Sequence, residues 1–116
     1  MEKVLIYITV SSREEANKIG ALLVEERLAA CVNIIEGMSS IYRWEGRIHM
    51  ETEVVVIAKT VADLIEKLIL RVKSIHSYKV PCIVSLPITW GNPDFLKWIE
   101  DETINKETIG VSTFEK

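Results

Sequence analysis

The chain has 116 residues, of which 48% are hydrophobic and 27% are charged. This length predicts one domain, and such an apolar composition excludes a disordered chain. The formal net charge is −3 and the basic residues form no cluster, which argues against a nucleic-acid binder. The apolar run 4–10 is too short to span a membrane and no secretory cleavage pattern follows it, so we expect a cytoplasmic protein. Cys31 and Cys82 are far apart, which argues against a disulfide framework or a zinc knuckle.

The first two elements are predicted to be a strand and a helix. Residues 3–10 are mostly β-branched or aromatic, which is typical of a strand. Ser12 is followed three residues later by Glu15, the pattern of a capping box, and apolar residues then recur with the period of a helix. We expect this helix to end near Leu28.

A long β-hairpin is predicted next. Residues 30–42 have the composition of a strand, and Gly37 within them indicates a bulge or a bend. Glu45 and Gly46 suit a hairpin turn, after which residues 47–59 are expected to return as a second long strand.

The C-terminal half is predicted to contain a helix, a strand and a short helix. Thr60 is expected to cap a helix that carries an apolar stripe over residues 61–75. Residues 81–88 are predicted to form a fourth strand. Residues 92–100 begin with Asn-Pro, a cap followed by proline at the first helical position, and are expected to form a third helix.

This order of elements, βαββαβ followed by a helix, predicts a ferredoxin-like α+β sandwich. Right-handed crossovers then give an antiparallel sheet of strand order 4-1-3-2, with the first and third strands central. Residues 1–100 are expected to form this domain. The polar residues 101–116 are expected to be a tail with at most one short element.

The two central strands carry apolar residues on both faces. Residues 5–8 and 54–57 do not alternate between apolar and polar, although the helices of this fold cover only one face of the sheet. A homo-oligomer, with a small closed ring favoured, would bury the second face. The alternative is that the C-terminal tail folds over it.

Few residues combine into a candidate site. His49, Glu51 and Glu53 point to one side of a strand, about 6.6 Å apart at each step, which suits either a divalent cation or a solvated hairpin end. His76 ends the second helix, either as a cap or as a ligand. The segment after the first strand lacks the glycines of a phosphate-binding loop, and no Ser–His–Asp set can be assembled, so we expect no enzymatic activity.

Several motifs resemble those of the divalent-cation tolerance proteins, the CutA family. In chain order they are Leu28-Ala29-Ala30-Cys31-Val32-Asn33, Ser40-Ile41-Tyr42-Arg43-Trp44-Glu45-Gly46, Lys59-Thr60, His76-Ser77-Tyr78-Lys79-Val80-Pro81 and Phe95-Leu96-Lys97-Trp98. The first two motifs are specific, and the match covers about residues 3–100 in the correct order.

The resemblance implies a homotrimer similar to the PII signalling proteins, with long hairpins wrapping neighbouring subunits. It also implies a role in tolerance of copper and other divalent metals, with a metal ion or small ligand bound at the subunit boundary. The family-typical residues of that pocket match Trp44, Glu53, Lys59, His76 and Tyr78, with His76 as the metal ligand. The alternative function is that of a PII-like signalling or scaffolding trimer acting through a protein partner.

The chain departs from the copper-binding pattern of the family. Ile8 stands where copper-binding members carry a cysteine, and Ile75 stands where they can carry a second histidine. Cys82, which follows His76 closely, is an alternative source of thiolate for soft copper. Because one imidazole binds copper weakly, the sequence predicts weak, His76-dependent Cu(II) binding that is lost on acidification.

Overall fold

A computed structural model describes residues 1–103 of the chain. Its elements are, in chain order, β1 (Lys3–Val10), α1 (Arg13–Glu25), β2 (Cys31–Trp44), β3 (Arg47–Val61), the 3-10 helix η1 (Ala62–Leu64), α2 (Ile65–Ile75), β4 (Ile83–Pro87) and α3 (Pro93–Asp101). The predicted βαββαβ order, followed by a helix, is therefore confirmed. No helix in this part of the chain combines the length and the hydropathy needed to cross a membrane.

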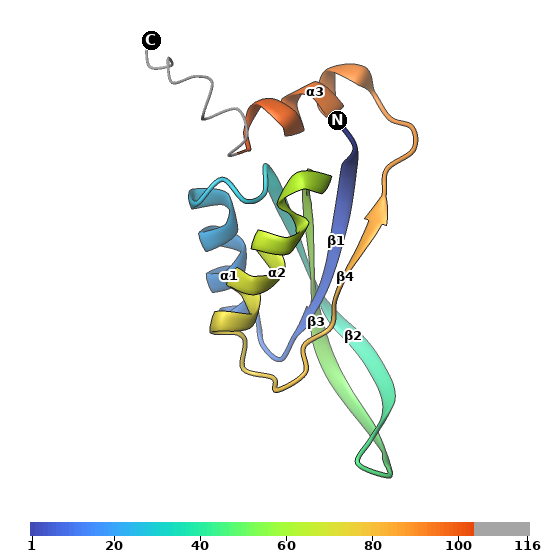
Figure 1. Ribbon diagram of the computed structural model, residues 1–116. Coiled ribbons are helices and arrows are strands. Elements are labelled where there is room, and N and C mark those ends of the chain that lie inside the picture. The colour runs from blue at the N-terminus through green and yellow to red at the C-terminus, as the bar shows by residue number, and fades with distance from the viewer. Residues whose placement is uncertain (104–116) are drawn as a thin grey trace.

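The four strands form one antiparallel sheet of order β2-β3-β1-β4, which is the predicted order read from the other edge. Helices α1 and α2 lie over one face of this sheet, and α3 crosses its end beside the N-terminus (Figure 1). The β2–β3 hairpin extends beyond the other elements as a two-stranded ribbon. The fold is a ferredoxin-like α+β sandwich.

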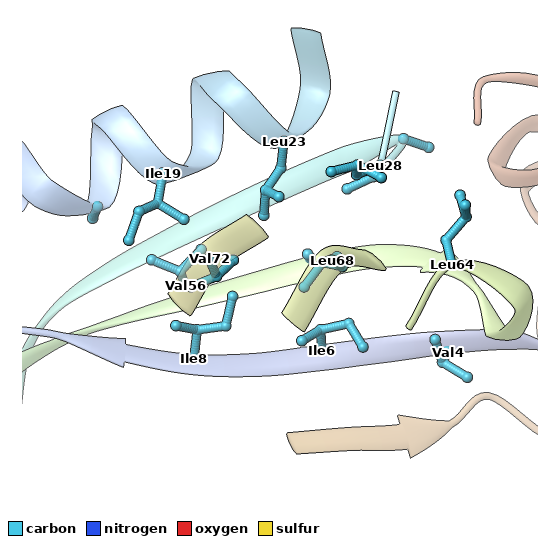
Figure 2. Close-up of a cluster of buried hydrophobic side chains, with 14 of the residues drawn as sticks. Val4, Ile6, Ile8, Ile19, Leu23, Leu28, Val56, Leu64, Leu68 and Val72 are labelled. Carbon is cyan, nitrogen blue, oxygen red and sulfur yellow. The ribbon is translucent and has the colours of Figure 1, made fainter. Parts of the chain in front are cut away.

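The hydrophobic core lies between the sheet and the helices. Every second residue of β1 points into it, namely Val4, Ile6 and Ile8, and Leu68 and Val72 of α2 pack there from above (Figure 2). All five side chains are at most 3% exposed. Burying an aliphatic side chain of this size contributes roughly 1.5–3 kcal/mol. Because side chains alternate along a strand, the residues between them on β1 face the other side of the sheet.

That other side of the sheet is also apolar. The strand register places Ile35, Val84 and Leu86 on the face opposite to Ile6 and Ile8. Their side chains are 52, 49 and 48% exposed, respectively. A single chain therefore leaves apolar surface open on this face, as the prediction of a homo-oligomer requires.

The local signals in the first half of the chain are confirmed. The Ser12 hydroxyl accepts a hydrogen bond from the Glu15 amide at 3.1 Å and caps α1, which ends a little earlier than expected. A register shift interrupts the β2–β3 pairing around Gly37, whose φ is 83°. Glu45 and Gly46 both have positive φ, 51° and 78°, as a tight type I′ hairpin turn requires.

The prediction that Thr60 caps the second helix is wrong. β3 continues to Val61, η1 follows, and α2 begins only at Ile65. Thr60 is extended and pairs with Val4, and its buried hydroxyl donates to the carbonyl of Leu28 at 2.8 Å. Strand pairing with β1 and this hydrogen bond therefore outweigh the local capping preference of the threonine.

The C-terminal helix begins as predicted, because the Asn92 side chain accepts a hydrogen bond from the Asp94 amide at 3.0 Å. The packed part of the chain continues beyond residue 100, since Thr103 is fully buried. The remainder of the predicted tail, residues 104–116, lies outside the described residues.

Candidate functional site

A groove of about 750 Å³ lies between the β2–β3 hairpin, the end of β1 and the loop 76–82 that joins α2 to β4. Three of the five residues predicted for the site line it, namely Trp44, Glu53 and Tyr78. The same groove is lined by further residues from β1, β2 and the loop, among them Tyr7, Tyr42 and Cys82.

Glu53 is the buried charged group of the groove, with 7% of its surface exposed. It lies on β3 opposite Met38, immediately after the bulge in β2. The Tyr78 hydroxyl donates a hydrogen bond to Glu53 Oε2 at 2.6 Å. Burial, together with this carboxylate, raises the pKa of Tyr78 far above its ordinary value, so the phenol stays protonated. The pair therefore consists of a neutral donor and a charged acceptor.

His76 follows α2, and its side chain is fully buried. Its Nε2 lies 2.8 Å from the Thr9 carbonyl oxygen, and its Nδ1 accepts a hydrogen bond from the Tyr78 amide at 3.0 Å. Because a carbonyl can only accept, this arrangement fits a neutral imidazole with its proton on Nε2. A metal ion at His76 would have to displace one of these two partners. Metal binding by His76 stays a prediction.

Glu15, in the first turn of α1, joins the helix to the loop. Its carboxylate accepts hydrogen bonds from the Ser77 amide at 2.7 Å, the Ser77 hydroxyl at 2.9 Å and the Ser11 hydroxyl at 3.0 Å. Burial alone would raise the pKa of Glu15, but the hydrogen bonds from Ser77 and Ser11 outweigh it and lower the pKa below 4.5. Glu15 thereby positions the loop that carries Tyr78.

Lys59 does not line the groove, although it lies on the same face of β3 as Glu53. Its ammonium group contacts the side-chain oxygen of Asn33 and lies 3.7 Å from the Cys31 sulfur. It also lies 6.0 Å from the centre of the Phe95 ring. The predicted set of site residues therefore divides into a groove and a separate cluster around Lys59.

Within residues 1–103, no three His, Cys, Asp or Glu side chains gather closely enough to bind a metal ion. The row of His49, Glu51 and Glu53 therefore does not form such a site within one chain, and His49 instead stacks on Tyr42 at 5.3 Å between ring centres. Burial and the charge of Glu53 raise the pKa of the Cys82 thiol. Since copper binds the thiolate, this shift weakens Cys82 as an alternative ligand.

Sequence reasoning missed the aromatic side chains that complete the groove. Tyr7 lies on the same face of the sheet as Glu53, which follows from strand alternation once the β1–β3 register is known. Tyr42 reaches that face because the bulge shifts the alternation of β2 by one residue. The role of Glu15 was also missed, because its partner Ser77 is far away in the sequence.

The profile of the family described as "CutA1 divalent ion tolerance protein" matches residues 4–102. The divalent-cation tolerance protein CutA of Thermus thermophilus is 50% identical over 103 residues, which are 89% of this chain and 99% of that protein. The chloroplastic protein CutA of Arabidopsis thaliana is 41% identical over 102 residues, 88% of this chain. The chain spans only 56% of the length of this plant relative.

Solved structures of the same family superpose closely. The Thermus thermophilus protein gives a TM-score of 0.84 at 50% identity, covering 89% of this chain and 99% of that one. CutA1 of Oryza sativa gives 0.86 at 37% identity, covering 89% and 94%. The Archaeoglobus fulgidus structure, described as periplasmic, gives 0.84 at 43% identity, covering 86% and 97%.

The names of these relatives bear on two further predictions. One relative is called chloroplastic and another periplasmic, so a cytoplasmic location for this chain stays a prediction. The family is named for tolerance of divalent ions and not for a reaction. On the match over residues 4–102 and the shared fold, the chain belongs to the CutA1 divalent ion tolerance protein family.

Proposed function

We propose that the chain acts in divalent-cation tolerance as a homotrimeric binding protein, with a divalent cation such as copper, or a small ligand, bound in the groove at a subunit boundary. The observation that carries this proposal is the state of Glu53. The residue as a whole is 7% exposed, and no basic side chain within residues 1–103 forms an ion pair with its carboxylate. A buried charge is costly unless it is paired, so the groove favours a positively charged occupant.

The position of the groove supports its placement at a subunit boundary. Tyr7 and Thr9 line the groove and also belong to the face of the sheet that carries Val84 and Leu86. A second subunit packed on this apolar face would therefore lie against the mouth of the groove. Such packing would remove water from the surroundings of Glu53 and strengthen its attraction for a cation.

Calorimetric titration with Cu²⁺ at neutral pH tests the proposed function. We expect weak, saturable binding to the wild type that is lost in Glu53→Gln and on acidification, because a protonated carboxylate or imidazole is not a ligand. His76→Ala shows whether the buried imidazole contributes. Glu66→Gln, which changes an exposed carboxylate on α2, is the matched control and should leave binding unchanged.

Two outcomes would contradict this proposal. A tight copper site that survives both Glu53→Gln and His76→Ala would place the ligands elsewhere, with Cys82 as the first candidate. The absence of any saturable metal or small-ligand site would favour the alternative of a PII-like trimer that acts through a protein partner.

A further inference from the structure

The Glu53 carboxylate has one oxygen atom available for a ligand. Tyr78 donates to Oε2, whereas Oε1 accepts no hydrogen bond from any group within residues 1–103. One basic side chain, Lys79, lines the groove, but it is exposed and forms no ion pair in this part of the chain. The groove therefore offers a negatively charged hydrogen-bond acceptor, and the ligand that it favours is a positively charged hydrogen-bond donor.

The walls around this acceptor are largely aromatic. The rings of Tyr7, Tyr42, Trp44 and Tyr78 all line the groove. Two of them are supported by neighbouring rings, since Tyr42 stacks on His49 at 5.3 Å and Tyr78 lies 4.8 Å from the His76 ring. Aromatic faces attract ammonium groups through the negative charge density above the ring, and sites for alkylated amines are built from such aromatic walls.

The same inventory of side chains suits an ammonium group better than a bare metal ion. A divalent metal requires several oxygen, nitrogen or sulfur ligands, and no three acidic, histidine or cysteine side chains converge within residues 1–103. An ammonium group requires only one carboxylate, further hydrogen-bond acceptors and a cationic contact with a ring. A hydroxyl group is present at Ser40, on the same face of the hairpin as Glu53, and apolar side chains for a short hydrocarbon chain are present at Met38 and Val80.

We propose that the ligand of the groove is a small aliphatic primary amine in its protonated form. Its ammonium group donates a hydrogen bond to Glu53 Oε1 and lies against the rings of Tyr42 and Tyr78, and its hydrocarbon chain lies along Met38 and Val80. This inference rests on the proposed function in one respect, that the groove is the binding site, and it names the chemical class of the occupant.

Calorimetry with n-butylammonium tests this inference on the full-length protein. The matched neutral probe is 1-butanol, which has the same hydrocarbon chain without the charge. We expect saturable binding of n-butylammonium to the wild type and at least tenfold weaker binding of 1-butanol. Glu53→Gln should weaken n-butylammonium binding at least tenfold, because it removes the charge with little change in shape. Glu66→Gln should leave it unchanged.

A second variant keeps the test valid if Glu53→Gln unfolds. Tyr42 is 38% exposed, so Tyr42→Leu should fold, and it should weaken n-butylammonium binding while affecting 1-butanol much less. Equal binding of both probes, or binding that is unaffected by both substitutions, would overturn the inference.

The copper titration separates failure of this inference from failure of the proposed function. If Cu²⁺ binds in a Glu53-dependent manner and n-butylammonium does not bind, the groove is a metal site and only the inference is wrong. If neither probe binds, the proposed function and the inference both fail. Tenfold tighter binding of the zwitterion 4-aminobutanoate than of n-butylammonium would also overturn the inference, because it would make Lys79 part of the site.

Discussion

Individual hydrogen bonds determine where the loop 76–82 lies against the rest of the molecule. Glu15 accepts both the amide and the hydroxyl of Ser77, and His76 links the Thr9 carbonyl to the amide of Tyr78. The contacts of Glu15 with Ser77 and of His76 with Thr9 join residues far apart in the sequence. The contact of His76 with the Tyr78 amide is local, but the orientation of its ring depends on the contact with Thr9. The hydroxyl of Tyr78 reaches the groove because the hydrogen bonds of His76 and Ser77 fix the start of this loop.

Replacement of Glu15 by glutamine should destabilise the protein by about 1–3 kcal/mol at neutral pH, because hydrogen bonds to a charged acceptor are lost. The pKa of Glu15 is lowered in the folded state from its ordinary value of 4.5. Its contribution is therefore fully present above the unfolded pKa and is lost as the pH falls through the lower folded pKa. Urea unfolding of wild type and Glu15→Gln at pH 7 and at about pH 3 measures this contribution. If the free energies of unfolding of wild type and Glu15→Gln differed by the same amount at both pH values, the charge of Glu15 would not contribute to stability.

At the scale of secondary structure, most of the element order could be predicted because its boundaries carry local signals. Ser12, Gly37, the Glu45–Gly46 pair and Asn92 each act through their own backbone or the next few residues. Thr60 is the exception, because its conformation is decided by pairing with β1 and by a hydrogen bond to a distant carbonyl. The residues next to Thr60 in the sequence do not show that strand pairing with β1 will outweigh helix capping.

The hairpin turn offers a test of these local preferences. Glu45 has φ 51°, a value that asparagine tolerates better, so Glu45→Asn should stabilise the protein by about 0.5–1 kcal/mol. Gly46→Ala should destabilise it by about 1 kcal/mol, for conformational reasons alone. A Cβ atom at Gly46 would meet no heavy atom within 4 Å, so no clash contributes. Urea unfolding measures both changes, and a stabilising Gly46→Ala would contradict the assigned turn.

At the scale of the whole molecule, the groove combines residues that the sequence could identify with an arrangement that it could not. Trp44, Glu53 and Tyr78 were predicted from the family resemblance, and all three line the groove. Lys59 was predicted with them, but it lies six residues from Glu53 along β3 and belongs to a separate cluster with Cys31 and Asn33. The contact between Glu53 and Tyr78 depends on the loop 76–82, whose path is set by hydrogen bonds to distant residues.

The open sheet face leads to a prediction about assembly. We expect the wild type to have a solution mass of about 40 kDa, that of three chains of 13.2 kDa. Leu86 is 48% exposed in the single chain, so Leu86→Lys should leave the monomer folded while placing a charge in the apolar interface. Light scattering should then show a lower mass for Leu86→Lys.

The matched control for this experiment is Leu70→Lys on α2, which alters an apolar residue that is 65% exposed on the helical side. This variant should retain the trimeric mass. A wild-type mass near 13 kDa, or an unchanged mass for Leu86→Lys, would mean that the open face is not the interface.

The bulge around Gly37 also affects how the hairpin can change during evolution. Between Ile35 and Met38, β2 contains one residue more than the opposing stretch of β3. This extra residue sets the side of the ribbon on which Tyr42 and Trp44 emerge. Loss of a single codon in this stretch would exchange the two sides of the hairpin at once, whereas a point substitution can alter only one side chain. The composition of the groove is therefore inherited through the length of this segment as well as through its amino acids.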